Sequence, residues 1–542
     1  MIGPRYLVNR DDQEGGGVGR PARSALPRRS FLHLAGLSAA AITAGIQAPA
    51  HAQSSFGSSS NGTADVPEGE LFGLGVASGT PGPDSMILWT RLAPDPLAED
   101  GHGGMGGEEV LVHWDVSRTE DFTDIVASGD ALAQPALAHS VHPQVTGLDP
   151  ATEYFYRFTA AGQTSPAGRF RTLPAADTEA DDFTFAVASC QAWYHGHFTP
   201  WKHLVEEPGL DLIIFVGDYI YEYAIVEGDN LWRQGASVPP AFEAKVETLE
   251  QYRLRYALFK TDPHLQAAHA RAAMSVTWDD HEVENNYAGD WSDTGVPTEH
   301  FLYQKAAAYR AFYENLPVAP EALPEGPENR IYTGFDVGDL ISFSILDTRQ
   351  YRDPVAASED PDVGETASML GAEQAQWLVD RLERSQAHWN ILVNSVTVAS
   401  IADSTDQWDG YPGARRKLMD QLAQVSNPVV FTGDIHQHCA AELWADPTVS
   451  EEDSEAVAVE LIATSVASDG DGAAGSNSTQ WLRHPYVKAM DRRRGYIRVD
   501  VSRDQLDAEF VVVPWIERDD TAPRDTAFHY FTRSGEHRLI EA

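Results

Sequence analysis

Cysteine is nearly missing from this chain, whose 542 residues include only Cys190 and Cys439. Two cysteines in a chain of this length exclude the disulfide framework on which small extracellular domains depend. The sequence leaves two possibilities open. Either the two thiols pair with each other, or one of them binds a ligand while the other is a buried bystander.

Basic residues are also scarce. The chain has 39 Lys and Arg against 81 Asp and Glu, which gives a formal net charge of -42 at pH 7. Proteins that bind nucleic acids need basic surface to contact the phosphate backbone, so this composition argues against a stable nucleic-acid partner. We interpret the excess of carboxylates as a solvated acidic surface, and a cluster of them would concentrate hard cations.

Long hydrophobic runs are lacking too. The apolar stretch at residues 34–50 is rich in Ala and Gly, and it is too weakly apolar for a membrane span. No later stretch could cross a bilayer. We therefore predict that the protein has no transmembrane anchor.

The same stretch has the flanks of an export signal. Arg28–Leu32 precedes it with paired arginines, and Ala50–Ala52 ends it with the small residues of a cleavage site. This order of features resembles a twin-arginine signal, with a membrane anchor as the alternative. We predict a leader at residues 1–52 that is cleaved after Ala52, the twin-arginine export machinery as a partner, and a periplasmic or extracellular mature protein.

The remaining composition is typical of a folded protein that has the size of an enzyme and more than one domain. Hydrophobic residues make up 42% of the chain, and 542 residues are too many for one simple core. Residues 66–175 show short strands such as Met86–Thr90, and alternation over Glu153–Phe158 places both tyrosines on one face. This pattern resembles a small fibronectin-III-like β-sandwich without catalytic residues.

From residue 183 the pattern changes to that of an α/β domain, which we place at residues 183–520. Strands are predicted at Phe183–Ser189, Leu212–Val216, Ala273–Trp278, Leu340–Leu346, Ile391–Ser395, Val429–Thr432 and Val459–Thr464, and two more, Tyr496–Val501 and Leu506–Val513, close the sheet. Helices are predicted at Thr248–Leu258, Phe301–Glu314, Gly371–Arg384 and Ala414–Gln424. Arg518–Ala542 is predicted to be an irregular polar tail.

Several of the predicted strands end on side chains that bind metals. Leu212–Val216 is followed by Asp218, which can bridge two metals, and by Tyr221, whose phenolate suits Fe(III). The other strand ends carry Cys190, Asp279, Asp280, His281, Asn285, Asp434 and His436. Because the carboxyl ends of parallel strands meet at one edge of a sheet, we predict that these residues share a site.

These strand ends also carry a resemblance to a known family. Ala188–Gln191, Gly217–Tyr221, Trp278–Glu282 and Gly433–His436 resemble the motifs of the PhoD-type alkaline phosphatases, which are calcineurin-like metallophosphoesterases. The resemblance extends over nearly all of the chain after the leader. It implies an α/β/β/α sandwich and an enzyme that hydrolyses phosphate esters at an iron and calcium site.

The resemblance further implies a set of metal ligands. Cys190, Asp218, Tyr221 and His436 would hold Fe(III), and Asp218, Asp280, Asn285 and Asp434 would hold Ca(II). The chemistry of the side chains agrees with this division. Thiolate, phenolate and imidazole suit a transition metal, whereas carboxylate and amide oxygens suit calcium.

A mechanism follows from a pair of metals about 3.5–4 Å apart. A hydroxide held by the pair would attack phosphorus in line. His281 is the candidate to position the phosphate or to protonate the leaving group. Arg349 either contacts the phosphate or forms a surface salt bridge.

Other residues near these motifs receive different interpretations. Asp279 is predicted to support a ligand or to cap a turn rather than to bind metal. His438 either supports a ligand or contacts substrate, and the sequence does not decide between the two. His195–His197 is interpreted as a loop near the rim of the pocket. Asp469–Gly472 lacks the ligand spacing of an EF-hand and is interpreted as an acidic loop.

The predicted substrates are small phosphate monoesters or diesters. A phosphodiesterase or phospholipase-D-like activity is the alternative within hydrolases, because both reactions use the same metal pair. A secreted metal-storing or adhesive module is an alternative from another class. A purple-acid-phosphatase-like enzyme is a third, but Cys190 and Asp434 depart from that family's pattern.

Overall fold

The structure of the protein is a computed structural model that describes residues 67–542, except 177, 361, 402–403, 451–454 and 476–480. The predicted leader, with its paired arginines and its cleavage site, lies outside the described residues. None of the helices in the described ranges combines the length and the hydrophobicity that crossing a bilayer requires.

Two antiparallel sheets form the N-terminal β-sandwich region. One contains β1 (Val76–Gly79), β2 (Ser85–Arg91), β5 (Ser140–Val141) and β6 (Gln144–Thr146), and the other contains β3 (Val110–Ser117), β4 (Ile125–Ala133), β7 (Glu153–Ala160), β8 (Gln163–Thr164) and β9 (Gly168–Arg171). Burial alternates along β7, so Tyr154 and Tyr156 share the inner face as predicted. The more specific likeness to fibronectin type III stays a prediction.

The N-terminal region packs against the larger α/β region through buried polar contacts. The Trp89 Nε1–H donates to the Glu314 carbonyl (3.1 Å), and the Arg91 guanidinium donates to Asn315 Oδ1 (3.1 Å). Both acceptors lie at the end of α4 (Thr298–Asn315). A buried charge needs hydrogen-bond partners, and the Arg91 guanidinium finds one of them in the α/β region.

Two seven-stranded sheets form the centre of the α/β region. The first has the order β12 (Ala273–Thr277), β11 (Leu212–Val216), β10 (Asp182–Ala188), β20 (Arg494–Ser502), β21 (Gln505–Val513), β22 (Asp525–Arg533), β23 (Ile540–Glu541). The second has the order β13 (Thr333–Val337), β14 (Ile341–Ile345), β15 (Trp389–Val393), β16 (Pro428–Thr432), β18 (Ala456–Ile462), β17 (His438–Trp444), β19 (Val487–Asp491). β10 to β12 are parallel, and so are β14, β15, β16 and β18.

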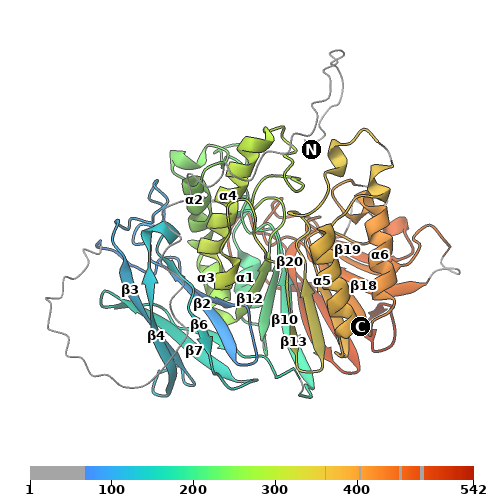
Figure 1. The fold of residues 1–542 in the computed structure, drawn as a ribbon, viewed down its shortest axis with the longest axis horizontal. Helices are drawn as coiled ribbons and strands as arrows, with labels where there is room; N and C mark the ends of the chain where they lie inside the picture. Colours follow the sequence, from blue (N-terminus) through green and yellow to red (C-terminus); the bar gives the residue numbers. More distant parts are fainter. Residues whose placement is uncertain (1–66, 177, 361, 402–403, 451–454, 476–480) are drawn as a thin grey trace, which may run out of the picture. The chain divides into compact units, whose positions relative to one another are not determined.

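Helices cover the outer faces of the two sheets and complete four layers, α/β/β/α (Figure 1). The outer face of β10–β12 packs against α1 (Thr199–Leu204), α2 (Leu249–Lys260), α3 (Pro263–Arg271) and α4. The second sheet packs against α5 (Gly371–Arg384) and α6 (Pro412–Leu422). A third core fills the space between the sheets. The predicted layered α/β class is therefore confirmed.

The prediction of an irregular tail at Arg518–Ala542 is wrong. Residues in this segment form β22 and β23 at the edge of the first sheet. Phe528 packs against Phe510 of β21, with ring centroids 4.3 Å apart, and Tyr530 is buried. The segment is ordered because it pairs with β21 and packs Phe528 and Tyr530 into the core.

Candidate metal centre

Four strand ends from both sheets converge at one edge of the α/β region. Cys190, Asp218 and Asp280 follow β10, β11 and β12, and Asp434 follows β16. A parallel bridge between Ser189 and Ser465 joins the two sheets at this edge. The two sheets approach each other closely at this point, since a Cβ added to Gly433 would lie 2.3 Å from Ser189 Oγ. Glycine at this position therefore allows the two sheets to meet.

The four predicted iron ligands lie together. Donor atoms of Cys190, Asp218 and His436 all lie within 4.8 Å of one another. The Tyr221 hydroxyl is 3.0 Å from Asp218 Oδ2 and 3.1 Å from His436 Nε2. Burial raises the pKa of both the Cys190 thiol and the Tyr221 phenol, and the Asp218 carboxylate raises them further. A cation bound here would favour the thiolate and the phenolate.

A second group is made of carboxylates. Donor atoms of Asp279, Asp280 and Asp434 lie within 4.8 Å of one another, and so do those of Asp218, Asp280 and His281. Among the described residues, Asp279 Oδ2 and Asp280 Oδ1 are buried without a hydrogen-bond partner. Burial raises the pKa of Asp434, and the neighbouring carboxylates raise it further. Buried oxygens that repel one another and lack partners fit a hard cation.

Asn285 lies beside the carboxylate group. Its side-chain oxygen accepts a hydrogen bond from the Tyr223 hydroxyl (3.0 Å), and its backbone N–H donates to Glu222 Oε1 (3.0 Å). The next residue, Asn286, donates its backbone N–H to Asp280 Oδ2 (2.6 Å). The structure therefore places Asn285 at the edge of this group, and its role as a calcium ligand stays a prediction.

His281 is oriented by Glu222 and surrounded by carboxylates. Its ring Nδ1 donates to Glu222 Oε2 (2.8 Å), and its ring centroid is 4.3 Å from that of Tyr221. Burial opposes protonation of the imidazole, but the charges of Asp280, Asp218 and Glu222 outweigh it and raise the pKa of His281 well above its usual value. The surrounding carboxylates therefore favour the protonated form of the imidazole.

Arg349 is buried, so the surface salt bridge considered for it is wrong. Its guanidinium donates to Asp279 Oδ1 (2.5 Å) and, through two nitrogens, to Asp406 Oδ1 (2.6 Å) and Oδ2 (2.9 Å). It also lies 3.6 Å from Asp280 Oδ1 and 3.9 Å from Asp434 Oδ1. One side chain thus links the segments that follow β12, β15 and β16.

Glu282 organises the strand ends behind the carboxylates. Its buried carboxylate accepts hydrogen bonds from the backbone N–H groups of Asp218 (3.2 Å), Tyr219 (2.6 Å) and Asp279 (2.9 Å). We predict no role for Glu282 from its sequence position alone. Its position three residues after Asp279 signals a turn, but its contacts with the end of β11 depend on the folded sheet.

Two further residues support the ligands from other loops. Asp469 Oδ2 lies 2.8 Å from His436 Nδ1, and the Gln407 amide donates to Asp434 Oδ2 (2.5 Å). A carboxylate behind a histidine ligand sets the tautomer and the orientation of the ring. Asp469 lies in the segment interpreted as an acidic loop without a role, and no local sequence signal connects it to His436.

His438 and Cys439 lie in the cores of the molecule. His438 Nε2 bonds the Val511 carbonyl (3.1 Å), its Nδ1 accepts the Thr464 N–H (3.1 Å), and burial lowers its pKa to about 4. These backbone contacts indicate a structural role in place of the two roles considered. Cys439 and Cys190 are both buried free thiols, so the possibility that they pair is wrong.

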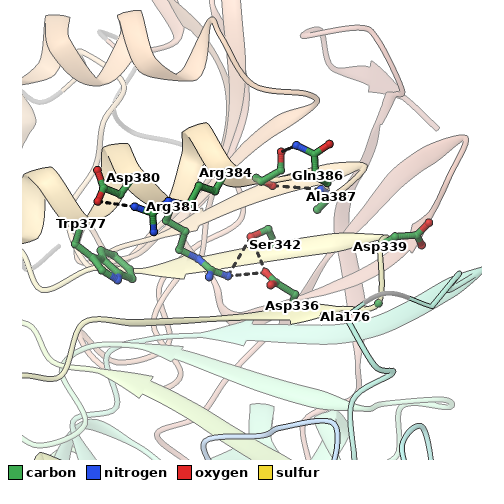
Figure 2. A pocket seen from close by; sticks show the side chains of 12 residues that line it. Ala176, Asp336, Asp339, Ser342, Trp377, Asp380, Arg381, Arg384, Gln386 and Ala387 are labelled. Carbon is green, nitrogen blue, oxygen red and sulfur yellow. Dashed lines mark hydrogen bonds and ion pairs between the residues drawn. The ribbon is translucent and has the colours of Figure 1, made fainter.

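A cavity of about 430 Å³ lies at the end of the second sheet that is opposite to the candidate ligands. Figure 2 shows Arg381 directed toward Asp336 and Ser342, to which it donates hydrogen bonds of 2.7 and 3.0 Å. Ser342 is near the start of β14, whereas the candidate ligands follow strand carboxyl ends. This cavity is therefore separate from the metal centre.

Comparisons with known proteins extend over both regions. A family model described as PhoD-like phosphatase matches residues 185–510, and the model of its N-terminal domain matches residues 58–174. Alkaline phosphatase D of Bacillus subtilis (strain 168) is 41% identical over 464 residues, which are 82% of this chain and 78% of that protein. A solved structure of PhoD has 39% identity and a TM-score of 0.82, covering 88% of this chain and 94% of that one. A purple acid phosphatase from yellow lupin seeds has 11% identity and a TM-score of 0.47, covering 86% and 72%.

Proposed function

Because the chain belongs to the PhoD-like phosphatase family and is a phosphoesterase, we propose that it is an alkaline phosphatase acting on small phosphate monoesters. The observation that carries this proposal is the convergence of a thiol, a phenol, an imidazole and several carboxylates from four strand ends. Family membership contradicts the metal-storing module, because that alternative assigns no reaction. A phosphodiesterase or phospholipase-D-like activity on the same centre is the second candidate.

We further propose which residues hold the metals. Fe(III) would be held by Cys190, Asp218, Tyr221 and His436, and Ca(II) by Asp218, Asp280, Asn285 and Asp434. A cation at the second position is supported by the clustered carboxylates of Asp279, Asp280 and Asp434, in which Asp279 Oδ2 and Asp280 Oδ1 lack a hydrogen-bond partner. When bound, two cations of this kind supply Lewis acidity that activates water and neutralises charge on the phosphoryl oxygens.

The proposed roles of the remaining residues follow from their contacts. His281 would donate a proton from Nε2 to the ester oxygen as the P–O bond breaks, so that the leaving group departs as the alcohol, because its Nδ1 is bonded to Glu222. A phosphate contact was one of the two predictions for Arg349. Its bonds to Asp279 and Asp406 instead favour a positioning role, in which it holds the carboxylates that surround the centre.

Metal analysis combined with kinetics tests this proposal. The purified protein is expected to contain iron and calcium, to hydrolyse p-nitrophenyl phosphate faster than bis(p-nitrophenyl) phosphate, and to lose activity in EGTA until calcium is restored. Elemental analysis and rates measured on the same preparation check this. Full activity after removal of both metals would contradict the centre, and a faster rate on the diester would establish the second candidate.

We also propose that the enzyme is exported by the twin-arginine route to the periplasm or the extracellular space. The support is the order of the paired arginines, the apolar stretch at residues 34–50 and the small residues at Ala50–Ala52. This route normally carries folded proteins, which suits an enzyme that binds its metals before export.

A further inference from the structure

Ser468 is a buried serine beside the candidate metal centre to which the proposed chemistry gives no role. Its hydroxyl donates a hydrogen bond to the Tyr221 hydroxyl oxygen (2.6 Å), and the residue is 1% exposed. Two further neighbours of that oxygen, Asp218 Oδ2 (3.0 Å) and His436 Nε2 (3.1 Å), belong to proposed iron ligands. Ser468 therefore contacts the phenol oxygen without belonging to the ligand set.

The direction of this hydrogen bond follows from the other partners of the two hydroxyl groups. The Ser468 oxygen accepts the backbone N–H of Ala192 (3.1 Å), which leaves its own O–H to donate to Tyr221. The Tyr221 hydroxyl in turn donates to Asp218 Oδ2. A cation held by Tyr221 and Asp218 would take the place of that phenol proton, whereas the hydrogen bond from Ser468 uses another lone pair of the phenol oxygen and can persist.

The backbone of Ser468 is held as firmly as its side chain. Its carbonyl accepts hydrogen bonds from the Ser465 hydroxyl (2.8 Å) and from the buried Arg494 guanidinium (2.5 Å). Its N–H donates to the Cys190 carbonyl (3.4 Å). The residue therefore joins the loop that carries the thiol to the phenol of Tyr221, and this network leaves its hydroxyl little freedom to move away.

The residue that follows Ser468 supports another proposed ligand, because the side chain of Asp469 bonds His436 (2.8 Å). Two consecutive side chains outside the ligand set thus contact two proposed iron ligands, Tyr221 and His436. Groups that bond to metal ligands fix their orientation. A hydrogen bond to a coordinating anion also withdraws charge from it, which makes the bound metal easier to reduce.

We propose that Ser468 is a positioning residue of the metal centre, whose hydroxyl donates to the Tyr221 phenolate when iron is bound, orients this ligand and raises the reduction potential of the iron. This inference rests on the proposed function, because it requires that Tyr221 is an iron ligand. A serine that served only to accept the Ala192 N–H would stabilise the fold and leave the reduction potential unchanged.

A redox titration of the iron-loaded protein, followed by the visible absorption of the ferric phenolate, tests the inference. Ser468→Ala is expected to shift the ratio of ferric to ferrous iron about threefold or more toward the ferric form at a fixed potential, because the phenolate loses a hydrogen bond. Ser468→Thr keeps a hydroxyl and is expected to restore the wild-type ratio. Ser465→Ala is the matched control without a shift, because the Ser465 hydroxyl bonds the carbonyl of Ser468 rather than Tyr221.

Metal content and activity separate this inference from the proposed function. An unchanged ratio in Ser468→Ala, with iron bound as in the wild type, would overturn the inference and leave the proposed function intact. An equal shift in Ser465→Ala would also overturn it, because a general loosening of the segment would then explain the result. If Ser468→Ala holds no iron, recovery of iron in Ser468→Thr supports the positioning role, and a folded Ser468→Thr protein without iron contradicts it.

The wild-type protein gives the remaining outcomes. Hydrolysis of phosphate esters by a wild-type protein without iron would contradict the proposed ligand set, and the inference with it. Absence of hydrolysis in an iron-loaded wild type would contradict the proposed function alone, because the redox titration requires no turnover.

Discussion

The backbone is strained at several of the candidate ligands. Cys190, Asp218, Asp434 and His436 have φ values of 54°, 59°, 66° and 52°, a left-handed region that residues with a side chain rarely adopt. Each such residue costs about 1–3 kcal/mol and persists only where the surrounding structure imposes it. Here Glu282, with its three backbone hydrogen bonds, imposes the turn after β11. The strained turns direct the donor atoms toward one point.

Leaving-group dependence tests the proposed role of His281. His281→Ala is expected to lower kcat/KM for glycerol 2-phosphate about 100-fold, because an aliphatic alkoxide leaves poorly without a proton. p-Nitrophenolate needs no such proton, so p-nitrophenyl phosphate is expected to lose much less. Steady-state kinetics with both substrates check this, with bound metal measured in parallel. Equal losses for the two substrates would contradict the proton-donor role.

The last segment of the chain protects the edge of the first sheet, because β22 lies beside β21 in the strand order. β22 pairs with β21 along its length, and Phe528 lies against both Phe510 and His438, with ring centroids 4.3 and 6.3 Å apart. The strand therefore closes the core on the side where β17 of the second sheet carries His438. Without it, β21 would become an uncovered edge.

Truncation measures the contribution of this edge. Deletion of residues 525–542 is expected to lower the free energy of unfolding by about 3 kcal/mol or more, because Phe528 and Tyr530 no longer bury their side chains. Denaturation in urea, followed by tryptophan fluorescence, gives the value. A chain that ends after Gly535 keeps β22 and is the control, expected to retain most of the stability. Equal unfolding curves for the two truncations would contradict a stabilising role for β22.

Some elements could be predicted from the sequence because local residues determine them. β11 matches its predicted bounds because five apolar residues end at Gly217, and α5 matches because an apolar stripe faces the second sheet. β22 was missed because only two large apolar residues, Phe528 and Tyr530, mark its core-facing side. Likewise, strand ends predicted the candidate ligands, whereas the contact of Asp469 with His436 arises only when distant loops meet.

The whole molecule combines a strongly acidic chain with a predicted export leader. The chain has a formal net charge of -42. Its leader nevertheless carries basic residues, among them Arg28 and Arg29, which precede the apolar stretch. If these two arginines are the recognised pair, replacing both should affect transport and leave the catalytic fold intact, because they lie before the predicted cleavage site.

A paired substitution tests export directly. Arg28→Lys combined with Arg29→Lys is expected to keep an active, uncleaved precursor in the cytoplasm, while the wild-type protein is exported and begins at Gln53. Cell fractionation with phosphatase assays and N-terminal sequencing check both statements. Arg20→Lys, which leaves the pair intact, is the control. Normal export of the doubly substituted chain would contradict the proposed route.

The bridge between Ser189 and Ser465 has a consequence for the order of events during biosynthesis. The donor atoms of the first sheet meet those of the second only after the two sheets have packed together at this bridge. A nascent or partly folded chain therefore lacks a complete set of ligands for a cation. We therefore expect maturation to run in one direction, with chain collapse first and ion capture second, and the captured ions then oppose unfolding by mass action. Under the proposed export of the folded protein, the proposed metals would leave the cell together with the enzyme, so that their binding would not depend on the metal supply outside.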